Sequence, residues 1–285
     1  MHKLKIIALY PEAGWGLPKV KSYASYVCTR AESVFRANMD VMETLGMVPG
    51  YAFMNGEDWG ISVIQAMNTV KAANPGRDVL PLDDDVQKLA SSIWDDYDRG
   101  GFDKSRRDHF REATENAEKM ACYPGRNLSH GALHSLLKSM ISGTWTAFEV
   151  LASSLVRESI AKHPRCFPHL TGNETFRFQK RESIRDAFRL AFNSDAKIQN
   201  AVESQCIDAV SLSRNLFIHK AGVVDQMFKD QCSEKGLTAW AALPIDSKLE
   251  FDGGVVLRLL QETIACGYSL LNGVDAWIVT NTPKP

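Results

Sequence analysis

Apolar side chains recur every three or four residues along most of the chain, which is the period of an amphipathic α-helix. The first such stripe covers residues 18–45, and Gly46 provides a signal for the end of a helix. A longer helix, of about nine turns, is expected from Ser129, a favourable N-cap residue, up to Pro164. Alternation typical of a strand is confined to residues 4–10. The sequence therefore predicts a mostly α-helical fold.

The second half of the chain holds three further segments with helical period. These segments are 183–192, 195–229 and 254–271. The character of the sequence changes near Tyr123-Pro124-Gly125, where an acidic, polar stretch gives way to long helices with apolar stripes. We therefore expect a domain boundary there, with residues 1–125 as an N-terminal, mainly helical region of unknown role and residues 126–285 as a second helical domain.

The charge balance limits how this protein can meet nucleic acid. The 285 residues contain 33 Lys and Arg against 34 Asp and Glu, which gives a formal net charge of -1. This balance argues against a protein that coats nucleic acid or an anionic membrane through bulk charge, and it leaves a local basic groove open. An apolar fraction of 45% in a chain of this length is enough for a substantial core, which excludes general disorder.

The six cysteines are far apart and form no C-x-x-C pair. This spacing argues against the usual zinc and dithiol sites and favours scattered, buried thiols in a reducing compartment. No apolar run approaches the roughly 20 residues of a membrane span, and the short apolar stretch near the amino terminus does not resemble a signal peptide. We expect a cytoplasmic protein without a membrane partner.

A polar stripe marks one face of the predicted helix 195–229. Its members, at steps of three and four residues, are Asp208, Ser211, Asn215 and His219. Arg214 directly precedes Asn215, and its guanidinium can reach over the same patch. A cation, an amide and a titratable base therefore converge on one surface.

This combination suits the cleavage of a phosphodiester whose neighbouring hydroxyl must be deprotonated. Near neutral pH an imidazole can take a proton from a ribose 2'-OH or give one to the leaving 5'-oxygen. A guanidinium fork stabilises the charge that builds on the phosphoryl oxygens, and an amide can orient either partner. The scheme requires no metal ion or cofactor, and we expect none.

The stretch Arg214-Asn215-Leu216-Phe217-Ile218-His219 resembles the R-N-x-x-x-H signature of HEPN domains, specifically the RiboL-PSP-like branch of HEPN ribonucleases. Three other segments agree with that branch in order and type: Trp145 to Glu149, Phe176 to Gln179 and Val274 to Trp277. The resemblance covers roughly residues 129–278.

The resemblance implies a HEPN-like helical bundle that forms a homodimer, with the two motifs meeting near the dimer axis. It also implies a metal-independent endoribonuclease that leaves a 2',3'-cyclic phosphate, in a toxin, antiphage or stress-response setting with an antitoxin or regulatory partner. By position Arg214 and His219 would be the catalytic pair and Asn215 the polar residue that follows the arginine. Glu149 would be an acidic helper, although an ordinary surface carboxylate is an equally good interpretation.

Contacts to the RNA backbone are argued from basic residues outside the motif. Arg181, Arg185 and Arg189 recur every four residues and would form a basic stripe that can follow phosphates. Glu182 and Asp186 lie beside them, so a solvated face with local ion pairs is an equal alternative. Lys220 would add positive potential next to His219.

Two other hypotheses remain open from the sequence. The first is a non-catalytic HEPN-like module that binds RNA, nucleotide or protein and dimerises without cutting. The second is a helical interaction protein whose motif is coincidental, and it predicts that Arg214 and His219 point apart. Residues 1–125 could form a second bundle, an autoinhibitory cover or part of a dimer interface.

Overall fold

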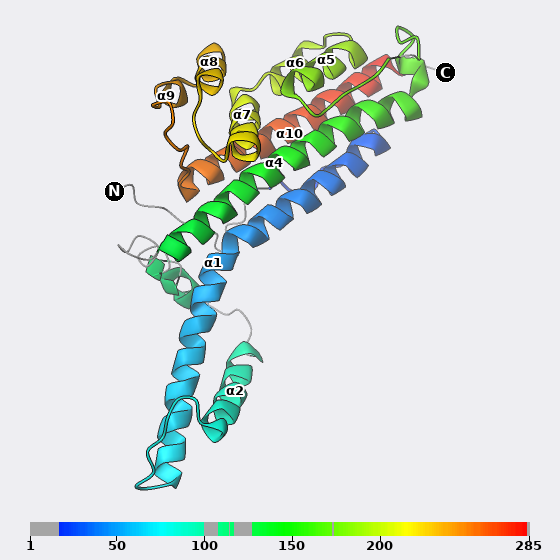
Figure 1. The fold of residues 1–285 in the computed structure, drawn as a ribbon. Helices are drawn as coiled ribbons and strands as arrows, with labels where there is room; N and C mark the ends of the chain where they lie inside the picture. Colours follow the sequence, from blue (N-terminus) through cyan, green and yellow to red (C-terminus); the bar gives the residue numbers. More distant parts are fainter. Residues whose placement is uncertain (1–16, 100–107, 114, 117–126, 173, 284–285) are drawn as a thin grey trace. The chain divides into compact units, whose positions relative to one another are not determined.

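The computed structural model describes residues 17–99, 108–113, 115–116, 127–172 and 174–283. In these ranges the regular structure is helical, and the extended backbone contributes an isolated bridge between Val223 and Lys248 (Figure 1). The mostly α-helical class predicted from the sequence is thereby confirmed. The strand-like residues 4–10 lie outside the described part of the chain.

The named elements follow one another along the chain. They are α1 (Tyr26–Ala73), α2 (Asp84–Arg99), α4 (Asn127–Lys162), the short 3-10 helix η1 (Pro164–Cys166), α5 (Arg181–Ala191), α6 (Ala196–Val202), α7 (Gln205–Lys220), α8 (Gln226–Glu234), α9 (Thr238–Ala241) and α10 (Gly253–Asn281). Among the residues described, no helix is both long enough and apolar enough to cross a membrane.

The chain forms two compact units. The small unit includes residues 46–133, and the large unit includes residues 13–45 together with 134–285. Helices α1 and α4 therefore contribute to both units. The boundary predicted between residues 125 and 126 lies outside the described residues.

The expected end of the first helix near Gly46 is wrong, because α1 continues for 48 residues to Ala73. It passes through Pro49, which lacks the N–H that an interior helical position normally donates. Each half of α1 nevertheless buries its own apolar face, with Phe35 in the core of the large unit and Ala66 in that of the small unit. The burial of apolar side chains in both halves of α1 therefore stabilises the continuous helix more than the local signals for a helix end destabilise it.

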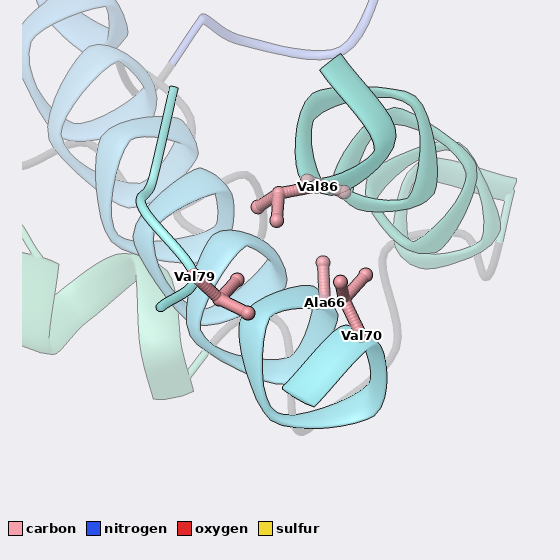
Figure 2. Close-up of a cluster of buried hydrophobic side chains, with 5 residues drawn as sticks. Ala66, Val70, Val79 and Val86 are labelled. Atoms are coloured by element: carbon pink, nitrogen blue, oxygen red, sulfur yellow. The ribbon is translucent and has the colours of Figure 1, made fainter. Parts of the chain in front are cut away.

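The small unit is held by a cluster of small apolar side chains. Ala66 and Val70 from α1 meet Val86 from α2, and Val79 from the connection joins them (Figure 2). The connection is fixed by Arg77, whose guanidinium nitrogens lie 2.9 Å from Asp83 and 2.6 Å from Asp85.

The large unit is built on three long helices. The first part of α1 runs beside α4 and α10 (Figure 1). Gly267 of α10 permits this packing, because a Cβ at that position would lie 2.5 Å from a ring carbon of Phe35 and 3.1 Å from Leu151. Arg30 of α1 also lies 3.6 Å from Glu158 of α4.

The expected single helix over 195–229 is wrong, since the chain forms α6, α7 and α8 there. Helix α7 ends where Ala221 and Gly222 adopt left-handed backbone angles, with φ of 53° and 84°. Helix α8 begins after Asp225, whose carboxylate accepts a hydrogen bond from the Phe228 N–H at 2.9 Å. The other expected helices are confirmed, although α10 extends ten residues beyond the predicted end at 271, to Asn281.

Candidate functional site

Helix α7 carries the motif and changes character along its length. Its first half is buried almost all round, and the Cys206 thiol donates to the carbonyl of Leu259 on α10 at 3.4 Å. Asp208 and Ser211, the first two members of the predicted polar stripe, are buried in this half. Asn215 and His219, the last two, are exposed. The motif therefore stands on the end of an anchored helix that emerges at the surface.

The motif residues line one hollow of about 410 Å³, which we call the α7–α8 hollow. The charged and polar residues that line it include Arg214, Asn215, His219 and Lys220 of α7. Lys180, the residue that precedes α5, also lines it. Its remaining lining residues are Gln179, Leu212, Leu216, Asp225, Met227, Phe228 and Gln231. All of these residues belong to the large unit.

A hydrogen bond joins the arginine and the amide of the motif. Arg214 Nη1 donates to Asn215 Oδ1 at 3.0 Å. This contact leaves the NH₂ group of Asn215 able to donate to a ligand in the hollow. Within the described part of the chain, the His219 imidazole makes no hydrogen bond, so both ring nitrogens are available to a substrate.

The hollow has a positive electrostatic character. Its lining contains the cations of Lys180, Arg214 and Lys220 against the single carboxylate of Asp225. Lys220 Nζ lies 3.4 Å from that carboxylate. The hydrogen bond from the Phe228 N–H has the largest effect on the pKa of Asp225 and lowers it, and Lys220 lowers it further. The carboxylate therefore stays ionised and offsets part of the charge of Lys220.

The predicted helper and two of the predicted RNA contacts lie elsewhere in the large unit. Glu149 is half-buried on α4 and does not line the hollow. Arg185 is half-buried and Arg189 is exposed, and neither lines the hollow. Arg189 Nη2 is 2.6 Å from Asp186, and both side chains are largely exposed.

Arg181 is not a surface residue, and the predicted basic stripe therefore does not include it. Its side chain is 3% exposed, and its Nε lies 3.1 Å from Asp208 Oδ1. Its Nη2 also donates to the carbonyl of Ser204 at 3.4 Å. Burial lowers the pKa of Arg181, and the neighbouring Asp208 carboxylate opposes that effect. The residue ties the start of α5 to the start of α7.

Sequence reasoning did not identify Lys180, Gln179 or the two α8 residues Met227 and Gln231 as part of the site. Both Lys180 and Gln179 are distant from the motif in sequence. Gln179 ends the segment Phe176 to Gln179, which supports the resemblance without assigning a role in the site, and nothing local marks Lys180. Gly222 and Asp225 are a typical helix stop and a typical N-cap, so they were the signal that α8 is a separate helix able to turn back on α7.

Other predicted features of the large unit can be located as well. Trp145, which begins one of the segments quoted for the resemblance, is 1% exposed and lies in the core. Four of the cysteines described are buried, in agreement with scattered buried thiols: Cys28, Cys166, Cys206 and Cys232. Among the residues that the structure describes, no three His, Cys, Asp or Glu side chains are placed so that they could hold a metal ion.

Comparisons of the chain with protein-family models, with curated proteins and with solved structures found no match.

Proposed function

We propose that this protein is a metal-independent endoribonuclease of the HEPN type that cleaves RNA through attack by a ribose 2'-OH. The observation that carries the proposal is that Arg214, Asn215 and His219 line one hollow with the further cations Lys180 and Lys220. A positive hollow with an imidazole and an ion-pairing fork provides the groups that this reaction needs.

The residues have separate tasks in this reaction. His219 accepts the proton of the 2'-OH as the 2'-oxygen forms a bond to phosphorus, and the bond from phosphorus to the 5'-oxygen breaks. The leaving 5'-oxygen takes up a proton, so the products are a 2',3'-cyclic phosphate and a 5'-hydroxyl end. Arg214 stabilises the extra negative charge on the phosphoryl oxygens. Asn215 orients that guanidinium through the 3.0 Å hydrogen bond.

A homodimer is part of the proposal. The reaction removes a proton from the 2'-oxygen and delivers a proton to the 5'-oxygen, and two imidazoles can do this most directly. The described lining of the hollow contains one imidazole, that of His219. A second copy of the chain would bring a second His219, as the resemblance to HEPN domains implies.

The geometry favours this hypothesis over a helical interaction protein with a coincidental motif. That alternative predicts that Arg214 and His219 point apart, whereas both line the same hollow. The proposal keeps the expected setting, a cytoplasmic toxin, antiphage or stress-response enzyme with an antitoxin or regulatory partner.

The test is cleavage of a mixed RNA pool by the purified protein in excess EDTA, with analysis of the product ends. We expect cyclic phosphate ends from the wild type. His219→Ala should lower the rate by about 10²- to 10⁴-fold, and Arg214→Ala by about 10²- to 10³-fold. Asn215→Ala should cost less, because Arg214 keeps its charge. His169→Ala is the matched control, since this exposed histidine lies outside the hollow.

The outcomes separate the hypotheses. Full activity in all three motif variants would show that the site is wrong. A wild type that binds RNA without cutting it would support the non-catalytic HEPN-like module instead. Loss of activity in the motif variants alone, with unchanged thermal unfolding, would establish the proposed roles.

A further inference from the structure

Helix α8 forms one wall of the α7–α8 hollow, and the side chains of this wall differ in charge from those of the wall formed by α7. Met227 and Gln231 are one helical turn apart on α8, and both line the hollow. Met227 is 59% exposed and Gln231 is also exposed, while Phe228 beside them is buried. Within α8 itself this wall presents a thioether and an amide and carries no charge, because the carboxylate of Asp225 belongs to the residue before the helix.

A neutral wall of this kind is not needed to hold a phosphate. The cations that line the hollow, Arg214, Lys180 and Lys220, can bind the phosphoryl oxygens. A volume of about 410 Å³ also lies in the range of pockets that hold whole small molecules. The hollow therefore has room for a group beyond the phosphate, with an apolar face and hydrogen-bonding edges.

The amides in the hollow are available for such a group. Within the described residues, the side chains of Gln179 and Gln231 make no hydrogen bond to the rest of the chain. By contrast, Gln226 on the same helix lies outside the hollow and donates to Asp230 at 2.7 Å. A glutamine amide can pair with a base edge through one donor and one acceptor, and a thioether can pack on the flat face of a base.

Resting on the proposed function, we propose that the α8 wall is a subsite for one unpaired nucleobase next to the scissile phosphate, and that Gln231 determines which base it prefers. Met227 packs against the face of the base, and Gln231 pairs with its edge. A base inside a duplex is stacked and paired, and cannot present both its face and its edge to this wall. The substrate is therefore RNA that is single-stranded at the cut.

The first experiment reads base preference from cleavage. A synthetic RNA pool with randomised sequence is digested by the full-length protein, and the bases flanking each cut are counted by sequencing. We expect the wild type to favour one base about tenfold over the least favoured at one flanking position. In Gln231→Ala this ratio should fall to within about twofold of the input pool.

Two further variants make the result specific. Gln226→Ala, a glutamine on the same helix outside the hollow, should keep the wild-type preference. Met227→Ala should weaken binding of all sequences while it keeps the preference, because packing on the face of a base does not depend on its identity. Unchanged thermal unfolding of each variant confirms that the fold is intact.

The failure of the subsite is distinguishable from the failure of the proposed function. If the wild type cleaves RNA and Gln231→Ala keeps the wild-type preference, the subsite is wrong and the ribonuclease stands. If the wild type does not cleave, binding of fluorescent 2'-deoxy oligonucleotides of single base composition is measured instead. Base-dependent affinity that Gln231→Ala removes would then support the subsite alone, and equal affinity for all four compositions would overturn it.

Discussion

The hydrogen bond from Arg214 Nη1 to Asn215 Oδ1, 3.0 Å long, restricts the conformations of the Arg214 guanidinium. A cation that is already oriented loses less conformational entropy when it meets a phosphate than a free lysine does. Lys180 and Lys220 are exposed, and they contribute mainly positive potential. Asp225, 3.4 Å from Lys220, reduces the contribution of that lysine. Lys180 is therefore the more effective of the two for binding an anion.

Lys180→Ala should weaken the binding of single-stranded nucleic acid and reduce its salt dependence. The slope of log affinity against log salt concentration should become shallower by about 0.7, which corresponds to one lost phosphate contact. The measurement is fluorescence anisotropy with a 2'-deoxy oligonucleotide, which resists cleavage by 2'-OH attack. Arg189→Ala should change the slope less, because Asp186 already neutralises that arginine. An unchanged slope in Lys180→Ala would remove this residue from the site.

At the level of elements, α7 is an anchored support for an exposed site. Its first turn is tied to α5 by the buried pair of Arg181 and Asp208, 3.1 Å apart. Cys206 in the same turn donates to the carbonyl of Leu259 on α10, and Leu216 within the motif is buried. The motif side chains therefore project from a helix whose position is fixed by the core, which favours precise placement.

Removal of one member of the buried pair should be strongly destabilising. Asp208→Ala leaves the Arg181 guanidinium buried without its partner, and we expect a loss of about 3 to 5 kcal/mol in the free energy of unfolding. The double variant with Arg181→Met and Asp208→Leu should recover most of it, since two apolar side chains can fill the space. Denaturant unfolding measures both effects.

The control for this prediction is Asp186→Ala, which breaks the exposed pair with Arg189 on α5. An exposed ion pair contributes only about 0 to 1 kcal/mol. If Asp208→Ala cost no more than Asp186→Ala, the buried pair would not hold α5 to α7.

At the scale of the molecule, the large unit places weakly acidic groups in its interior. Burial raises the pKa of Cys28 and of Tyr268, each to about 12, and that of Cys232 to about 11. Cys28 comes from α1, Cys232 from α8 and Tyr268 from α10, so the core of the whole unit is involved. These groups are neutral in the folded protein well above the pH at which they ionise in the unfolded chain.

The large unit should therefore lose stability in alkaline solution. The folded pKa of Cys28 lies above the unfolded value of 9.0, so below about pH 9 the thiol is protonated in both states. Between about pH 9 and 12 only the unfolded chain releases the proton of Cys28, and the free energy of unfolding falls by up to about 1.4 kcal/mol per pH unit. The corresponding windows are about pH 9 to 11 for Cys232 and about pH 10 to 12 for Tyr268. Denaturant midpoints from about pH 8 to about pH 11 measure this trend.

Cys28→Ala provides the comparison for the alkaline series. It removes one of the buried acids, so its stability should fall less steeply with rising pH than that of the wild type. A wild-type midpoint that stays constant across the series would contradict the burial of these groups in the folded state.

Local signals were sufficient for some elements and misleading for others. The run that begins near Ser129 and ends before Pro164 is α4, because its apolar stripe and terminal proline agree, although Ser129 lies inside a helix that already begins at Asn127 and is not its N-cap. Gly46 indicated a helix end, yet α1 continues through it and through Pro49 because both halves of the helix are packed. In 195–229 the apolar period concealed the left-handed turn at Ala221 and Gly222. The spacing of apolar residues predicts which side chains are buried, but it does not predict where the backbone turns between two helices.

The sequence by itself determined the α-helical class and the placement of Arg214, Asn215 and His219 on one helix, because helical period and spacing are local properties. Only the tertiary structure decided which basic residues are exposed: it buries Arg181 against Asp208 and brings Lys180 to the hollow. It also placed Met227 and Gln231 of α8 in that hollow. The physical reason is that burial and charge pairing depend on packing between helices that lie far apart along the chain.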